Sequence, residues 1–288
     1  MIIDAHAHLW KKQSGIVNGK PVYDIGGGRS NFGGEIKQMM PPYMTDGENT
    51  AERFLANMDY AGVSGAVITQ EYIDGNQDEY LLSCKSDRVK ICALYEEKEM
   101  GDISGFDGIK ICAGRLKDKN LLNHLEPFRL AEKNGKFISI DLADGDEQTS
   151  EMQKIAEMFP KLRIAIGHFG MVTRENWLEQ IKLAKNENVF IESGGITWLF
   201  NGEFYPYPSA VKAINEAADL VGYEKLMWGS DYPRTMTAIT YKMSLDFIEK
   251  TTEISEENKR LILGENARKF YGFKDLPVPQ KVKNMVED

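Results

Sequence analysis

The stretch Met1–Trp10, MIIDAHAHLW, places two histidines one residue apart on an otherwise apolar run. The run predicts a strand over residues 1–6. Side chains alternate along a strand, so we expect Asp4, His6 and His8 on one face and the apolar residues between them on the other. Two imidazoles held in this way by a stiff strand can bind one metal ion. A hydrogen-bonded pair of core histidines is the alternative.

Similar short apolar runs recur along the chain, and helical patterns follow most of them. Eight strands alternating with helices within about 230 residues favour a (β/α)8 TIM barrel over a doubly wound sheet. No G-x-G-x-x-G follows the first strand. Ser150 and Gln153 form a capping-box pattern at one helix start. The predicted strands are 1–6, 65–70, 89–94, 108–112, 137–141, 163–167, 189–192 and 226–230, and the predicted helices include 50–61, 121–134, 150–159 and 208–221.

Two segments lie outside this pattern of one barrel over residues 1–274. Residues 10–49 carry eight glycines and no helical period. They follow the first strand, so we expect a long, lid-like loop over the face where barrel active sites form. Residues 275–288 contain two prolines and are expected to form a C-terminal arm. Such an arm could dock on a second copy of the chain in a homo-oligomer.

Composition narrows the class of partner. The net charge is −9 and the pI is near 5.2, which disfavours nucleic acids and anionic membranes. The sequence shows no signal-peptide pattern and no apolar run near the roughly 20 residues that span a bilayer. Three cysteines without C-x-x-C spacing argue against a disulfide framework or a cysteine-rich zinc site. We expect a cytoplasmic protein that acts on a small molecule.

Two further residues follow predicted strands at the same end. His168 ends the sixth strand in RIAIGHFG, and Asp231 ends the eighth in LMWGSDYP. Strand ends that are distant in sequence converge at the mouth of a barrel, so both residues could join His6 and His8. Separately, each has an ordinary explanation, as a buried structural histidine or as a helix cap. His124, the remaining histidine, falls within a predicted helix and is expected to have a packing or surface role.

Five segments taken together resemble the amidohydrolase superfamily: IDAHAHL, GIKI, IAIGHFG, LMWGSDYP and GENARKFYGF. They are most similar to its amidohydrolase-2 group, which includes aminocarboxymuconate-semialdehyde decarboxylase-like enzymes and lactonases. The resemblance implies a (β/α)8 barrel with one metal ion. It implies that His6 and His8 are ligands, that Asp231 is both ligand and proton acceptor, and that His168 contacts the reacting water or substrate.

One position departs from the family pattern. The family usually has a histidine ligand at the end of the fifth strand, and Asp141 stands there in GKFISIDLADGD. Zn²⁺ is the expected ion, and Mn²⁺ is an alternative because oxygen ligands such as Asp141 suit harder ions. Catalysis without a metal, as in some lactonases of the superfamily, also stays open. Lys110 on the fourth strand could bind an anionic substrate or form a structural salt bridge.

The expected reaction is hydrolysis of a lactone or amide by a metal-activated water, because a divalent ion makes hydroxide available near neutral pH. The same residues could instead promote loss of CO₂ from a carboxylated ring. Arg115 and Arg234 follow strands on the active face and suit a substrate carboxylate. Candidate wall and rim residues are Trp10, Trp198, Tyr232 and Glu71.

Three other classes of protein remain as alternatives. A metal-dependent DNase also begins with a D-x-H-x-H-like run, but that group has a glutamate where Lys110 stands. A histidine-rich phosphoesterase needs more histidines than four. A non-catalytic barrel that binds a ligand would explain the missing fifth-strand histidine.

Overall fold

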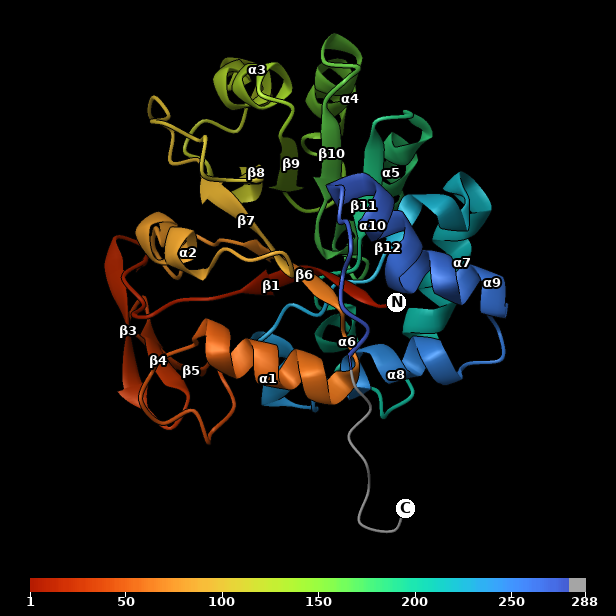
Figure 1. Cartoon of the computed structure of the whole chain (residues 1–288). Coiled ribbons are helices and arrows are strands. Elements are labelled where there is room, and N and C mark those ends of the chain that lie inside the picture. The colour runs from red at the N-terminus through yellow and green to blue at the C-terminus, as the bar shows by residue number, and fades with distance from the viewer. Residues whose placement is uncertain (280–288) are drawn as a thin grey trace.

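A parallel sheet of eight strands forms the centre of the molecule, which the computed structural model describes over residues 1–279. The first and last strands close it into a barrel: Ala5 N donates to Trp228 O at 2.9 Å, and His8 N to Tyr232 O at 2.8 Å. The predicted (β/α)8 barrel is confirmed (Figure 1). The strands in order are β1 (Ile3–His8), β6 (Gly65–Thr69), β7 (Val89–Leu94), β8 (Gly108–Cys112), β9 (Phe137–Asp141), β10 (Arg163–Ile166), β11 (Val189–Glu192) and β12 (Leu226–Met227).

Helices surround the barrel and cover the outward side chains of its strands. Ile109, Ile111, Ile138 and Ile140 belong to the large core between strands and helices, where alternating β-branched residues pack well. The helices are α1 (Ala51–Ala61), α2 (Asp78–Cys84), α3 (Leu125–Lys133), α4 (Thr149–Met158), α5 (Trp177–Lys182), α6 (Ile196–Leu199), α7 (Pro208–Val221), α8 (Met243–Lys250), α9 (Glu256–Arg260) and α10 (Asn266–Tyr271).

Two local predictions about helix ends were wrong. Ser150 lies inside the first turn of α4, whose N-cap is Gln148, and no side chain caps this helix. Gln148 is used elsewhere, since its Oε1 accepts from Ala143 N at 2.8 Å. His124 stands at the N-cap of α3 rather than within a helix. It is buried between Tyr95 Oη and Asp118 O, each at 2.9 Å, which agrees with the expected packing role.

The first strand does not keep the simple alternation that its sequence predicts. Its register against β6 shifts between Asp4 and Ala7, and such an irregularity changes which face a side chain meets. Ala5 packs with Val67 and Cys92 in a second, smaller core cluster, called the lower core here. Ala7 packs in the large core between strands and helices. Asp4 accepts hydrogen bonds from Ser230 and from Tyr241 Oη, so it ties the first strand to the last instead of joining the histidines.

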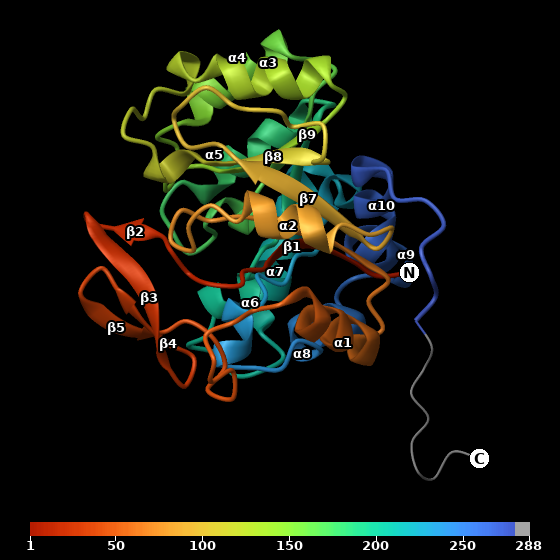
Figure 2. The same cartoon turned by 60° about the vertical axis from the view of Figure 1, so that its left-hand side comes forward.

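Residues 10–49 form a small antiparallel sheet, not the irregular loop that was expected. Its strands are β2 (Ile16–Val17), β3 (Lys20–Gly26), β4 (Arg29–Phe32) and β5 (Glu35–Gln38). Gly33 and Gly34 make the turn between β4 and β5 at φ of 66° and 101°, a backbone region that favours glycine. The sheet projects from one end of the barrel (Figure 2).

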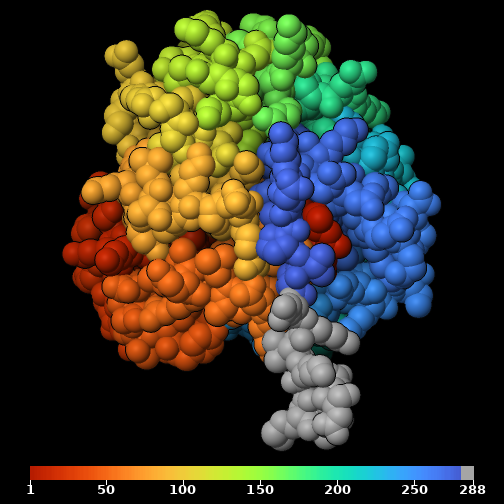
Figure 3. Space-filling model, viewed as in Figure 1, coloured from red at the N-terminus to blue at the C-terminus, as the bar shows by residue number. Residues whose placement is uncertain are grey.

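The opposite end of the barrel is closed by the C-terminal helices. Phe270 and Tyr271 of α10 pack with Ile3 and Phe137 in the lower core. The space-filling view shows the N-terminus as a small red area enclosed by the blue C-terminal segment (Figure 3). Leu276 also packs in this core, so the predicted arm over 275–288 begins against its own barrel. Residues 280–288 of that arm lie outside the described residues. Among residues 1–279, no helix has the length and hydropathy to cross a bilayer.

Candidate active site

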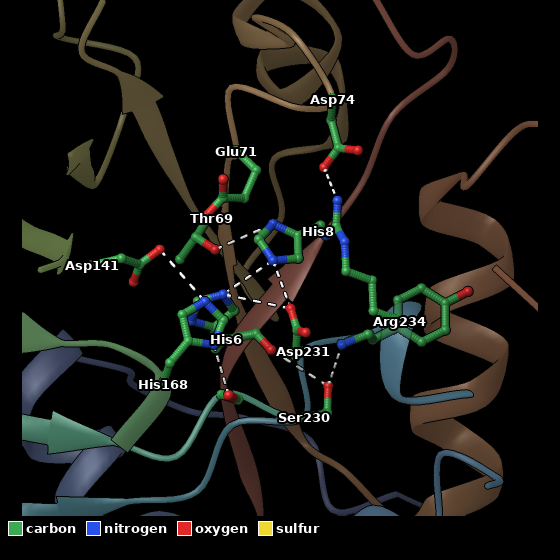
Figure 4. Close-up of polar contacts among 12 residues, drawn as sticks. His6, His8, Thr69, Glu71, Asp74, Asp141, His168, Ser230, Asp231 and Arg234 are labelled. Atoms are coloured by element: carbon green, nitrogen blue, oxygen red, sulfur yellow. Dashed lines mark hydrogen bonds and ion pairs between the residues drawn. The ribbon is translucent and has the colours of Figure 1, made fainter. Parts of the chain in front are cut away.

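The two histidines of β1 point into the barrel at its open end, where their Nε2 atoms lie 3.0 Å apart (Figure 4). Both rings are buried. Two nitrogens bound to one tetrahedral ion at about 2.0–2.1 Å each stand about 3.3 Å apart. The observed separation is close to that value. His6 and His8 therefore present a pair of nitrogens spaced for a shared ion.

Asp231, distant in the sequence, completes a triangle of donor atoms with His6 Nε2 and His8 Nε2. Its Oδ1 lies 2.9 Å from His8 Nε2 and 3.8 Å from His6 Nε2. Its Oδ2 accepts from Trp198 Nε1 at 2.7 Å, and its backbone N donates to His6 O at 2.8 Å. Asp231 has a φ of 57°, and backbone in this region is held in place by its surroundings, often at functional sites. The predicted convergence of the first and last strands on one point is present.

Glu192, which the sequence did not single out, holds His6 from behind. Its Oε1 accepts from His6 Nδ1 at 2.6 Å, and its Oε2 accepts from Gly194 N at 2.6 Å. A carboxylate on Nδ1 fixes the tautomer that leaves Nε2 free to act as a ligand. Glu192 is the last residue of the predicted seventh strand, and that strand-end position was the available signal.

Burial and charge keep the triangle in the form that binds metal. Burial lowers the pKa of His8 to about 4, although the hydrogen bond to Asp231 works in the other direction. Burial alone would raise the pKa of Asp231, but His8 and the nearby cations outweigh it and hold that pKa below its usual value. His8 is therefore neutral and Asp231 ionised at neutral pH. These are the protonation states that a divalent ion requires.

His168 lies beside the triangle, with its ring centroid 4.7 Å from that of His6. Its Nδ1 donates to Gly194 O at 2.8 Å, and its Nε2 lies 3.6 Å from Asp141 Oδ2. Burial would lower the pKa of His168, but the carboxylates around it, Asp141 first, raise it to about 10. The imidazolium therefore has an Nε2 proton to donate within the site.

Asp141 stands next to the triangle and not within it. Its Oδ2 lies 2.6 Å from the buried Lys110 Nζ. The lysine outweighs the effect of burial and holds the pKa of Asp141 well below its usual value. Gly167 leaves the room that this carboxylate occupies, because a Cβ there would lie 2.0 Å from Asp141 Oδ1. One Asp141 oxygen, one ring nitrogen of His6 and one of His168 also lie within 4.8 Å of one another.

A cavity of about 690 Å³ opens above these residues, at the carboxyl ends of the strands. Its wall includes His8, Asp141, His168 and Asp231, and the small sheet contributes Phe32 and Lys37. This is the end of a barrel where active sites form. The small sheet thus forms part of the cavity wall, and a lid-like role for residues 10–49 stays a prediction.

The remaining predicted residues divide between the wall and the layer behind it. Arg115, Arg234, Glu71 and Trp198 line the cavity. Lys110, Trp10 and Tyr232 are buried and do not belong to the wall. Lys110 supports Asp141, Trp10 lies behind Arg234 at 5.6 Å from the guanidinium, and Tyr232 packs on Phe54 and Tyr241.

The donor set fits a single divalent ion. Two imidazole nitrogens and one carboxylate oxygen converge from His6, His8 and Asp231, and three protein ligands with an open position are typical of catalytic zinc sites. The carboxylate on His6 Nδ1 supplies the supporting contact that such ligands usually have. Because the Lys110 ion pair engages Asp141, that residue is placed as a neighbour of the site more than as a fourth ligand.

Comparisons with known proteins agree with this architecture. A family model described as amidohydrolase matches residues 3–273. The structure of a probable 2-pyrone-4,6-dicarboxylic acid hydrolase from Acinetobacter baumannii, with citric acid bound, is similar with a TM-score of 0.68 at 19% identity, over 94% of this chain and 99% of that one. An amidohydrolase from Burkholderia multivorans with bound zinc is similar with a TM-score of 0.68 at 14% identity, over 95% and 100%.

A more distant likeness is to 5-carboxyvanillate decarboxylase from Sphingomonas paucimobilis, with a TM-score of 0.52 at 16% identity, over 79% of this chain and 84% of that one. At these identities the likenesses show a shared fold. No curated protein sequence matches the chain.

Proposed function

The chain belongs to the amidohydrolase family and is an enzyme, and from that premise we propose that it hydrolyses a small carbonyl compound, a carboxylated lactone or amide, with one divalent metal ion. The observation that carries this proposal is the convergence of His6 Nε2, His8 Nε2 and Asp231 Oδ1 below the cavity. Zn²⁺ is the expected ion, because two of the three ligands are imidazoles. Mn²⁺ is the alternative.

A bound divalent ion would lower the pKa of a coordinated water towards about 7 and polarise the substrate carbonyl. The residues of the chain do the rest. Asp231, whose Oδ2 accepts from the Trp198 indole, would take the proton from that water and return it to the leaving group. His168 keeps a proton on Nε2 and can donate it as a hydrogen bond to the oxygen on which negative charge develops.

The substrate class follows from the cavity and from the neighbours. A cavity of about 690 Å³ accommodates a ring-sized molecule, and Arg115 and Arg234 in its wall suit a carboxylate. The neighbour from Acinetobacter baumannii, a probable 2-pyrone-4,6-dicarboxylic acid hydrolase, supports a carboxylated lactone. The zinc bound in the neighbour from Burkholderia multivorans supports the choice of metal.

Non-oxidative decarboxylation is the second candidate. It is favoured by the likeness to 5-carboxyvanillate decarboxylase and would use the same metal and the same Asp231. The two reactions differ in their products. Hydrolysis opens a lactone ring to a hydroxy acid, whereas decarboxylation releases CO₂.

The test measures metal content and turnover together. Purified protein should bind one zinc ion per chain, and it should hydrolyse members of a panel of carboxylated lactones in a reaction that chelation stops and zinc restores. His6→Ala should lose the metal. His124→Gln, which changes the histidine at the N-cap of α3 outside the cavity wall, should keep it. Full metal content in His6→Ala would show that the site is elsewhere. CO₂ release from carboxylated phenols without lactone hydrolysis would select the decarboxylase.

A further inference from the structure

Arg234 enters the cavity wall from the short helical turn Arg234–Thr237, three residues after Asp231. Its Nη2 donates to Asp74 Oδ2 at 2.7 Å (Figure 4). Its guanidinium carbon lies 5.6 Å from the centre of the Trp10 ring. Its other two donor atoms, Nε and Nη1, are buried and have no hydrogen-bond partner among residues 1–279. The guanidinium is thus fixed through Nη2 and has two unused donor atoms.

The Nη2 contact belongs to a chain of buried hydrogen bonds that begins in the small sheet. Ser30 Oγ of β4 donates to Gln13 Oε1 at 2.6 Å, and Gln13 Nε2 donates to Asp74 Oδ1 at 3.0 Å. All three of these side chains are buried. A carboxylate held in this way offers Arg234 one preferred orientation. Fixing the guanidinium before ligand binding lowers the entropy cost of recognition.

The other cations of the cavity region are engaged or exposed. Arg115 is 47% exposed, and its Nε lies 3.3 Å from Glu71 Oε2. Lys37 is also 47% exposed, near Glu35. Lys110 is paired with Asp141 behind the wall. Arg234 therefore differs from them in combining burial with two unused donors.

Buried charged donors without partners are costly, and a guanidinium N–H forms a strong, charge-assisted hydrogen bond to a carboxylate. We propose that Arg234 is the specificity-determining residue of this enzyme, that a carboxylate of the substrate accepts a hydrogen bond from one of its unpartnered donors, Nε or Nη1, and that Asp74 is the positioning residue for that contact. The proposal deepens the proposed function and rests on it for the reaction.

Binding of a defined probe tests the anchor independently of turnover. Benzene-1,3-dicarboxylate and its neutral diamide differ in charge and little in shape, and calorimetric titration measures their dissociation constants for the full chain with and without zinc. The metal-free titration excludes binding of the carboxylate through the ion. We expect the wild-type chain to prefer the dicarboxylate in both states. Arg234→Gln should weaken the dicarboxylate about 10- to 100-fold and change the diamide less than about threefold.

Two further variants allow the proposal to be tested if Arg234→Gln folds poorly. Arg234→Lys keeps the charge but not the fixed orientation of the guanidinium N–H groups, so it should recover only part of the affinity. Arg129→Gln removes an exposed arginine from α3 and should bind like the wild type. Equal weakening of dicarboxylate and diamide in Arg234→Gln, or unchanged dicarboxylate binding in both Arg234 variants, overturns the proposal.

Asp74 is tested through its dependence on Arg234. Asp74→Asn should weaken the dicarboxylate in the wild-type background and add nothing in the Arg234→Gln background, because a positioning residue acts only through its partner. Additive losses would refute that role. The two proposals fail separately. Preference for the dicarboxylate without turnover of any lactone contradicts the proposed hydrolase alone, and turnover of carboxylated lactones with no loss in Arg234→Gln contradicts the anchor alone.

Discussion

Lys110 Nζ and Asp141 Oδ2 lie 2.6 Å apart inside the barrel, joining the fourth strand to the fifth directly below the site. The lysine is buried completely, and the aspartate nearly so. Each charge offsets the cost of burying the other. The pair therefore sets the electrostatic environment of His168, which lies on the other side of the same carboxylate.

We predict that Lys110→Met destabilises the protein by about 3–5 kcal/mol, because it removes the nearest counter-charge of a largely buried carboxylate. Adding Asp141→Asn to Lys110→Met should recover part of that loss, since the buried negative charge is then gone. Urea unfolding followed by circular dichroism measures both. A loss under about 1 kcal/mol in Lys110→Met would show that the His168 imidazolium alone balances the Asp141 charge.

The contact between Glu192 and His6 predicts a change in metal affinity without a change in ligands. Glu192→Gln keeps the shape of the side chain but removes the charge that fixes the His6 tautomer. Loss of such a supporting contact typically weakens metal binding about 10- to 100-fold. Competition against a fluorescent zinc chelator measures the affinity, with the exposed Glu157→Gln on α4 as control. Unchanged affinity in Glu192→Gln would contradict the supporting role.

His8 predicts how the stability of the zinc-free protein depends on pH. Its pKa falls from 6.5 in the unfolded chain to about 4 in the folded one, so between these values the unfolded chain binds the extra proton. Stability from this group is present above about pH 6.5 and is lost as the pH falls towards 4. The loss is on the order of 2–3 kcal/mol. The stability of wild type minus that of His8→Gln, measured by urea unfolding across this range, should rise with pH, and a flat difference would contradict the shift.

The raised pKa of His168 predicts that kcat also depends on pH. Its pKa of about 10 keeps the ring cationic at neutral pH, so kcat should fall as the pH rises through that value. His168→Gln should lower kcat about 10²- to 10³-fold, the usual effect of removing one oxyanion donor, and should abolish the high-pH fall. Zinc content should match the wild type, because His168 is not in the ligand triangle. Loss of zinc in His168→Gln would instead place it among the ligands.

The fold could be predicted from the sequence because it rests on local patterns. The strands at 89–94, 108–112, 137–141 and 189–192 were predicted with their observed bounds. Barrel topology followed from the alternation of strands with helices, since parallel strands require such crossovers. The small sheet of residues 10–49 was missed because its strands are short and the turns between them are rich in glycine, so no apolar period distinguishes the segment from a loop.

The candidate site was predicted in part. His6, His8, His168 and Asp231 could be found because each lies near or just beyond the carboxyl end of a strand, and these ends converge at the same end of the barrel. Glu192 also ends a strand, but a single acidic residue in sequence carries no sign of its partner. The shift in β1 that separates Asp4 from the histidines depends on pairing with β6, which no local pattern shows.

The sequence by itself determined the barrel and the residue types at its open end, because hydrophobic periodicity and strand order act locally along the chain. Only the tertiary structure decided which of those residues touch. Closure of β12 against β1 brings Asp231 to the histidines across more than two hundred residues, and packing of neighbouring strands pairs Asp141 with Lys110. Differences of a few tenths of an ångström in the distances between such groups decide whether a carboxylate binds an ion, a lysine or a substrate. Those distances are set by the packing of the whole barrel.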